Sequence, residues 1–182
     1  QTKSQMGTRK AESSETQSVV FDDLKSRYYA MIAGSSSAQK RGYEFEKLLH
    51  DLAKHAALET TEPFRANGEQ IDGAIKYDGE HYIIEAKWQA KEMSNEAVYQ
   101  FAGKVEGKMY GRGIFISVNG FSDNVVQSLV SGKAIKTIFV DGEDLSLVFE
   151  KIISFSAMLD AKIKAAQTKG HIYIHPITTR SK

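Results

Sequence analysis

The chain has 182 residues, of which 41% are hydrophobic and 26% are charged, which suits a single domain with a substantial apolar core. Its formal net charge of +1 excludes a polycationic nucleic-acid coat, and the lack of cysteine excludes disulfides and thiolate metal sites. The sequence contains neither an apolar run that could span a bilayer nor a visible signal peptide, so a reducing, cytoplasmic setting is expected.

The N-terminal part of the chain is divided into a polar segment and a helical segment. Residues 1–18 are rich in Ser, Thr, Gln and Lys, which predicts a flexible tail. Residues 19–39 are expected to form a helix and a linker, and four apolar residues recur there at near-helical spacing: Phe21, Leu24, Tyr28 and Met31. Residues 40–182 are expected to form one domain. The start at Gln1, without a methionine, is consistent with a chain trimmed or cut from a longer protein.

Helical and extended patterns then alternate along the chain. A helix is predicted over 40–58, with an apolar stripe of Tyr43, Leu48, Leu52 and Ala56. The segment "ETTEPF" is a weak strand candidate, and residues 69–88 form a hairpin pattern around the turn signal Asp78-Gly79. A second helix is expected from the cap Ser94 to about Tyr110, with a buried face of Val98, Phe101, Ala102, Val105 and Met109.

The C-terminal half continues the alternation. "GIFISV" and "AIKTIFV" are short apolar runs typical of central strands, and "SDNVVQSLVSG" between them predicts a helix with Ser122 as cap and Gly132 as terminator. A long helix is expected from Asp141 to about Lys169, ended by Gly170, and "HIYIH" could add an edge strand. This order predicts an α/β fold with a central mixed β-sheet flanked by helices on both faces.

The hairpin places charged residues where a half-buried strand is expected. With Asp78 and Gly79 as the loop, pairing outward sets Asp72 opposite Glu85 and Gln70 opposite Lys87. Alternation then puts six side chains on one face: Gln70, Asp72, Ala74, Ile83, Glu85 and Lys87. The other face is apolar, with Ile71, Ile75, Tyr82, Ile84 and Ala86.

Two opposed carboxylates, with Cβ atoms roughly 4.5–5.5 Å apart, repel each other and raise each other's pKa. A hard divalent cation such as Mg²⁺ between Asp72 and Glu85 would remove this repulsion, because it prefers oxygen ligands. Lys87 on the same face could orient or help deprotonate a water, or stabilise negative charge, which suits hydrolysis of a phosphodiester. The alternative interpretation is a solvated cross-strand cluster in which both acids pair with Lys87.

Ile71-Asp72 followed by Glu85-Ala86-Lys87 resembles the PD-(D/E)XK signature of restriction endonuclease-like nucleases. The upstream "GYEFEKLL" (residues 42–49) resembles the G-x-x-F-E helix of the Mrr-like branch, and the likeness covers roughly residues 40–150. The resemblance implies a restriction endonuclease-like fold and a Mg²⁺-dependent deoxyribonuclease, with Mn²⁺ as a substitute. It also implies that Asp72, Glu85 and the Ala86 backbone carbonyl hold the metal, that Lys87 acts on the attacking water, and that Glu46 completes the catalytic set.

The sequence departs from the family pattern in two positions and in one domain. Ile71 replaces the family's Pro, and Glu85 stands where Mrr-like members often carry Gln.

The resemblance implies restriction of, or defence against, foreign DNA. Two alternatives stay open. One is a Holliday-junction-resolvase-like repair nuclease, which would favour a homodimer. The other is a non-catalytic, nuclease-fold DNA-binding or assembly module of a larger protein or complex. The winged-helix domain of many Mrr proteins has no room upstream, so the part that recognises the target is unassigned.

Several polar residues around the signature are candidates for contacts to DNA phosphates. Gln100, Lys104 and Lys108 follow one another at i, i+4 spacing, Arg112 follows in a Gly-rich turn, and Gln89 and Lys91 lie just beyond the signature. The alternative for the helical residues is a solvated face. Trp88 is expected in the core. His171 and His175 lie four residues apart but lack a third ligand, so they are a weak metal signal. "GKMYGRG" lacks the features of a phosphate loop, so no nucleotide cofactor is expected.

Overall fold

The structure is a computed structural model that describes residues 2–34, 36–66, 68–130 and 136–182, with side chains from Ser14 onward. The elements, in chain order, are α1 (Thr2–Ala33), α2 (Ala38–His55), β1 (Glu59–Thr61), β2 (Phe64–Ala66), β3 (Glu69–Ile71), β4 (Ala74–Tyr77), β5 (Glu80–Lys87), α3 (Asn95–Glu106), β6 (Gly113–Ser117), α4 (Asp123–Val130), β7 (Thr137–Asp141), α5 (Gly142–Phe149) and α6 (Phe155–Lys169).

The strands form a five-stranded sheet in the order β1-β4-β5-β6-β7 and a separate two-stranded sheet of β2 and β3. β1, β4 and β5 are antiparallel neighbours, whereas β5, β6 and β7 are parallel. The weak strand candidate "ETTEPF" is thus divided between β1 and β2. The predicted α/β fold with a mixed central sheet is confirmed.

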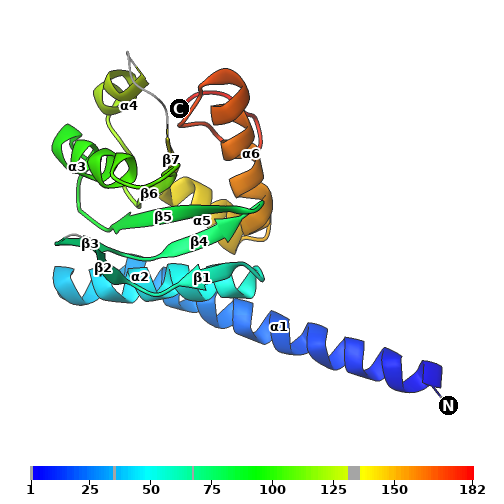
Figure 1. Cartoon of the computed structure of the whole chain (residues 1–182). Coiled ribbons are helices and arrows are strands. Elements are labelled where there is room, and N and C mark those ends of the chain that lie inside the picture. The colour runs from blue at the N-terminus through cyan, green and yellow to red at the C-terminus, as the bar shows by residue number, and fades with distance from the viewer. Residues whose placement is uncertain (1, 35, 67, 131–135) are drawn as a thin grey trace.

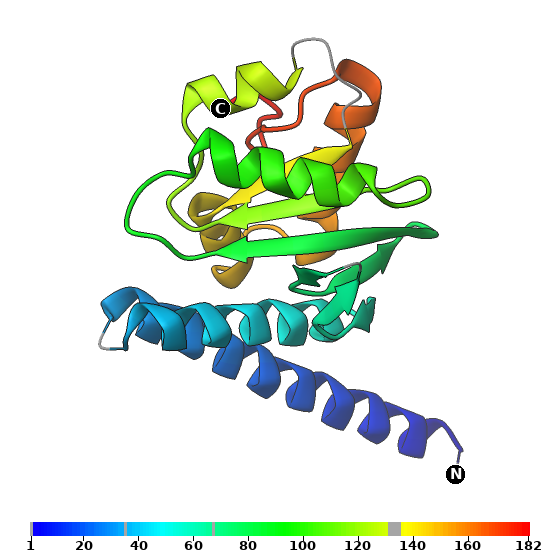
Figure 2. The ribbon, with the colours of Figure 1, turned by 60° about the vertical axis from the view of Figure 1, so that its left-hand side comes forward.

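Helices cover both faces of the central sheet (Figures 1 and 2). On one face, α1, α2, α5 and α6 pack against Ile75, Tyr82, Ala86 and the apolar residues of β6 and β7 that point the same way. On the other face, α3 and α4 pack against Ile83, Phe115 and Phe139. Both faces of the hairpin are therefore covered, and none of the described helices is both long and apolar enough to cross a membrane.

Helix α1 is anchored by its C-terminal half. The four residues predicted to face the core are all buried, and Tyr28 stacks on Phe149 with ring centroids 4.6 Å apart. Lys25 Nζ and Tyr29 Oη both donate to the Glu150 carboxylate, which fastens α1 to the end of α5. The helix begins at Thr2, so residues 2–18 are helical where the sequence suggested a separate tail. Residues 14–20 are exposed, and the flexibility expected for 1–18 stays a prediction.

Some predicted helix boundaries and faces are wrong. Tyr43 is 69% exposed, because it lies on the side of α2 that faces away from the sheet. Helix α3 ends at Glu106 with Gly107 as its C-cap, so Met109 lies in the following turn and is 89% exposed. The predicted terminator Gly132 lies outside the described residues.

The long helix expected over 141–169 is two helices, α5 and α6. Lys151 between them has a φ of +58°, and the Ser154 side chain caps α6 by accepting from the Ala157 N–H at 3.1 Å. Gly170 ends α6 in the left-handed region with a φ of +71°, as predicted. The segment "HIYIH" is not a regular strand, although Ile172 O accepts from Phe139 N–H of β7 at 2.9 Å.

A buried charged cluster closes the carboxyl end of β7. The Lys162 and Asp144 side chains are both fully buried, and Lys162 Nζ lies 2.7 Å from Asp144 Oδ2. Lys182 Nζ lies 2.7 Å from Asp141 Oδ2, which also accepts from Tyr173 Oη at 2.6 Å. The sequence analysis did not anticipate this cluster, which ties the C-terminal segment to the start of α5.

Ser117, the last residue of β6, lies between Lys87 of β5 and Asp141 of β7 in the parallel ladders. It is fully buried, and its hydroxyl has no hydrogen-bond partner among the described residues. Burying a hydroxyl without a hydrogen-bond partner costs stability. Ser117 therefore destabilises the face of the sheet that packs against α3 and α4.

Candidate active site

The candidate site forms just before the start of β4, where the chain passes from β3 into the central sheet. The β4–β5 ladder runs from Tyr77↔Glu80 to Ala74↔Ile83, in the register that the Asp78-Gly79 turn predicts. The expected continuation to Asp72–Glu85 and Gln70–Lys87 pairs is wrong, because β3 pairs with β2 instead and Gln70 lies opposite Arg65. The departure also carries Ile71 to the α3 side of the sheet, opposite to the predicted face.

Gly73 makes this departure possible. Its φ is +141°, and a Cβ built there would lie 2.9 Å from the Thr61 carbonyl oxygen of β1. A residue with a side chain would therefore be strained and would collide with backbone. Gly73 O still accepts from Ile84 N–H at 2.8 Å, so the chain keeps one ladder bond before it turns away.

The Asp72 side chain then replaces the missing strand. Asp72 Oδ2 accepts from the Ala86 N–H at 3.0 Å, the donor that an uninterrupted partner strand would have bonded. The carboxylate is thereby held beside β5 without being in a strand itself. The predicted cross-strand pair of Asp72 and Glu85 is therefore absent, and the hydrogen bond to Ala86 N–H, next to Glu85, is what brings Asp72 close to Glu85.

Three carboxylates and two ammonium groups, those of Lys87 and Lys104, converge at this point. Lys87 Nζ lies 2.8 Å from Glu85 Oε1 and 4.0 Å from Asp72 Oδ2. Glu46 of α2 faces the same group, and the pKa of its carboxyl is raised to about 7, first by burial and then by the charge of Asp72. Burial likewise raises the pKa of Asp72, against the Ala86 N–H that lowers it. The site therefore holds more negative charge than Lys87 alone compensates.

The Lys87 ammonium is firmly protonated in this setting. Burial lowers the pKa of Lys87, but its hydrogen bond to Glu85 and the charges of Glu85, Asp72 and Glu46 outweigh burial and raise it. A lysine in that state donates hydrogen bonds and stabilises negative charge, whereas it does not accept a proton.

Lys104 belongs to the site, although the sequence suggested a contact with DNA phosphates. Its Nζ donates to Glu85 Oε2 at 3.0 Å and to the Gln70 carbonyl oxygen at 3.0 Å. Phe101 and Val105 are buried on the side of α3 that faces the sheet. Lys104 lies next to them on the helix, so its side chain reaches Glu85 of β5. The signal in the sequence was its position beside the apolar stripe rather than on the opposite side of the helix.

The other helical candidates are farther along α3. Lys108 Nζ donates to the Lys104 carbonyl oxygen at 2.8 Å and approaches Glu69 Oε2 at 3.5 Å. Gln100 is exposed and its Nε2 donates to Glu96 Oε1 at 3.4 Å. Neither touches the three carboxylates of the site in these contacts.

The remaining candidates lie at the two ends of β5. Arg112 Nε is 3.4 Å from Glu80 Oε2, near the hairpin turn and therefore at the end of β5 away from Lys87. Gln89 and Lys91 follow Lys87 in an exposed loop, and the Gln89 carbonyl accepts from Asn119 Nδ2. The structure thus brings only the loop pair to the end of β5 that carries Lys87.

The donor set fits a hard divalent cation. No group of three or more metal-ligating side chains is prearranged around an ion position among the described residues. In their place, the oxygens of Glu85 accept from Lys87 and Lys104, and one oxygen of Asp72 accepts from Ala86 N–H. Carboxylate oxygens and a backbone carbonyl are the ligands that Mg²⁺ prefers. Burial chiefly, and neighbouring carboxylates in addition, raise the pKa values of Glu46 and Asp72, and a bound cation would offset both effects.

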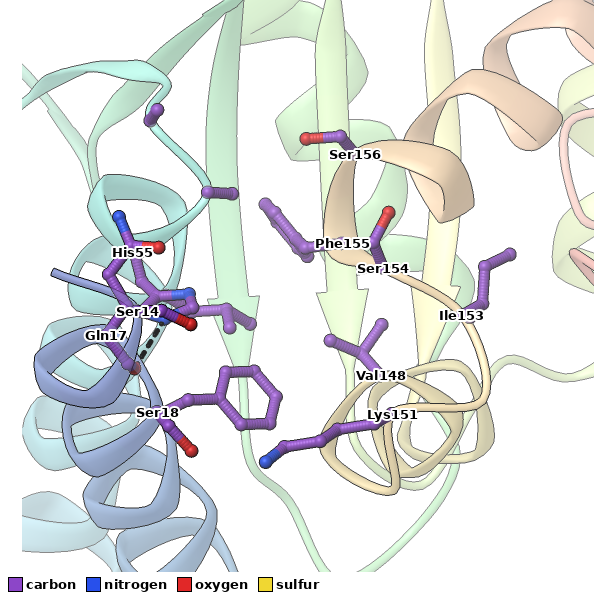
Figure 3. Close-up of a pocket in the computed structure, with 14 residues that line it drawn as sticks. Ser14, Gln17, Ser18, His55, Val148, Lys151, Ile153, Ser154, Phe155 and Ser156 are labelled. Carbon is purple, nitrogen blue, oxygen red and sulfur yellow. Dashed lines mark hydrogen bonds between the residues drawn. The ribbon is translucent and has the colours of Figure 1, made fainter. Parts of the chain in front are cut away.

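Two cavities differ in their relation to the site. A small one of about 10 Å³, lined by Glu46, Asp72 and His50 among others, has room for about one water. A larger one of about 630 Å³ lies between α1, the end of α2 and the α5–α6 connection, where Phe21, His55 and Lys151 line it (Figure 3). The larger cavity contains none of the converging carboxylates.

The family model Mrr_cat, described as a restriction endonuclease, matches residues 38–148, which is more than half of the chain. A protein of unknown function, AF1548, is similar over 68% of this chain and 77% of its own, with 21% identity and a TM-score of 0.45. The MspJI restriction endonuclease in complex with a 27-mer oligonucleotide is similar over 90% of this chain and 38% of its own, with 17% identity and a TM-score of 0.42. The curated proteins contain no match.

Proposed function

Since the chain belongs to the Mrr_cat restriction endonuclease family, we propose that it is a Mg²⁺-dependent nuclease that hydrolyses DNA phosphodiester bonds, in restriction or defence. The observation that carries this proposal is the convergence of Glu46, Asp72, Glu85 and Lys87 just before the start of β4. A solvated surface cluster would not explain it, because the Asp72 and Glu85 side chains are only 6% and 9% exposed.

The proposed metal ligands are the carboxylates of Asp72 and Glu85 and the backbone carbonyl of Ala86. When bound, Mg²⁺ would neutralise these acids and supply Lewis-acid activation of water and phosphate. Mn²⁺ is expected to substitute, because its preferred ligands are also oxygens. Asp72 is suited to the role because its bond to Ala86 N–H fixes one of its oxygens in place.

The proposed roles of the other two residues follow from their charge states. Lys87, held as an ammonium, would stabilise the negative charge that develops on the phosphate during attack. Glu46, whose pKa of about 7 leaves it divided between acid and carboxylate near neutrality, is suited to take a proton from the attacking water. No covalent intermediate with the protein is needed.

The direct test is incubation of plasmid DNA with the purified chain and Mg²⁺ or Mn²⁺. We expect cleavage that is lost in Asp72→Asn and Lys87→Met and retained in Glu44→Gln, a matched control. Glu44 lies on the same helix as Glu46 but pairs with Lys40 at 3.7 Å, away from the site. DNA binding without cleavage under either metal would refute the enzymatic proposal in favour of a non-catalytic binding module.

A further inference from the structure

Each carboxylate oxygen of Glu85 is paired with a lysine ammonium group. Lys87 Nζ lies 2.8 Å from Oε1, and Lys104 Nζ lies 3.0 Å from Oε2. The Glu85 side chain is only 9% exposed, so water has little access to these two contacts. A metal that binds through a Glu85 oxygen would compete with one of these ammonium groups, since like charges at such separations repel.

The two lysines differ in how easily each can leave. Lys87 is two residues from Glu85 on the same strand and also faces Asp72, so the strand itself keeps it within the acidic cluster. Lys104 reaches Glu85 from α3, so its backbone is not part of the strand that carries Glu85; its side chain is 19% exposed, against 34% for Lys87. It also has a second acceptor, the Gln70 carbonyl oxygen at 3.0 Å, outside the carboxylate cluster.

We propose that Lys104 is a displaceable counter-ion: it occupies Glu85 Oε2 without metal, is released when a divalent cation binds, and then contacts a DNA phosphate. This inference rests on the proposed function and adds a coupling to it. The Gln70 carbonyl keeps the released ammonium beside the site, where it meets the polyanion. Metal and DNA then bind cooperatively, because each is favoured by the same movement of one side chain.

The first measurement is Mn²⁺ affinity without DNA, by titration calorimetry. Lys104→Met and Lys104→Gln both remove the competing charge, and both are expected to bind Mn²⁺ about tenfold more tightly than the unaltered chain, the scale of one charged hydrogen bond. Lys108→Met is the matched control. It removes an equal charge one turn along α3, from a lysine that contacts Glu69 rather than Glu85, and should leave the affinity nearly unchanged.

The second measurement is DNA affinity with and without Ca²⁺, by fluorescence anisotropy on a short labelled duplex. Ca²⁺ should strengthen DNA binding by the unaltered chain and by Lys108→Met more than it does for Lys104→Met. Circular dichroism of each variant checks that it is folded.

The outcomes separate this inference from the proposed function. Mn²⁺ binding that depends on Asp72 but is no tighter in both neutral Lys104 variants than in Lys108→Met would overturn the displacement. Equal enhancement by Ca²⁺ in all chains would overturn the phosphate contact. An absence of Asp72-dependent Mn²⁺ binding would instead overturn the proposed metal site, and the inference with it.

Discussion

Replacing Glu46 by Gln should stabilise the metal-free protein above neutral pH. The folded chain raises the pKa of Glu46 from 4.5 to about 7, chiefly by burial and by the Asp72 charge. Between these values the folded state holds a proton that the unfolded state has lost, so stability falls as pH rises through this window. The difference corresponds to roughly 3 kcal/mol at about 1.36 kcal/mol per pH unit. Because Glu46 is partly exposed, we expect about 1–2 kcal/mol after allowance for solvent screening.

The assay is urea unfolding of the metal-free chain at pH 5 and pH 8. Glu46→Gln should gain about 1–2 kcal/mol at pH 8, or roughly 2–8 °C in the melting temperature, and gain much less at pH 5. Glu44→Gln, which removes an exposed charge on the same helix, should show no such pH dependence. If Glu46→Gln changed the stability equally at both pH values, the pKa of the Glu46 carboxyl would not be raised in the folded state, and the reasoning would fail.

Three further substitutions test the packing around the site by urea unfolding. Gly73→Ala should cost about 1–3 kcal/mol, since φ is +141° and the new Cβ meets the Thr61 carbonyl; a stability equal to the unaltered chain would contradict this. Ser117→Ala should leave stability unchanged or raise it by about 1 kcal/mol, since the hydroxyl is unpartnered among the described residues, and a clear loss would reveal a missing partner. Lys162→Met should cost about 1–3 kcal/mol, because it removes one of the two ammonium groups that contact the buried Asp144 and leaves only Lys182, and adding Asp144→Asn should recover part of the loss, whereas strict additivity would argue against the pair.

Local patterns predicted most of the fold, because each strand and helix is encoded by its own periodicity. The buried runs of β6 and β7 and the Asp78-Gly79 turn are examples. The break between α5 and α6 was not predicted, since residues 150–154 have the composition of a helix and the break depends on how both helices pack against the sheet. Tyr43 and Met109 were misplaced for a related reason: apolar spacing does not say where a helix loses contact with its neighbours.

The site was predicted from chemistry rather than from geometry. The residue types and the family resemblance were the basis for proposing Asp72, Glu85 and Lys87, which lie close together in the structure, but the register argument failed at Gly73, where the chain departs from the ladder. A glycine inside a strand pattern is a known sign of such an interruption and could have indicated it. Lys104 was assigned to DNA because its contact with Glu85 depends on how α3 crosses the sheet, which spacing along the helix does not determine.

The packing of α1 also bears on what the smallest independently folding unit is. The family match covers only residues 38–148, but α1 lies outside it and packs on the core. Tyr28 of α1 stacks on Phe149, and its ring centroid lies 6.0 Å from that of Trp88, which in turn packs edge-on against Phe45. A chain trimmed to the matched residues would lose α1 and α6 and leave part of one apolar face of the sheet open to water, which favours aggregation. Expression of this nuclease domain should therefore begin upstream of Phe21 and extend through Lys182, which is anchored by Asp141 and Asp144.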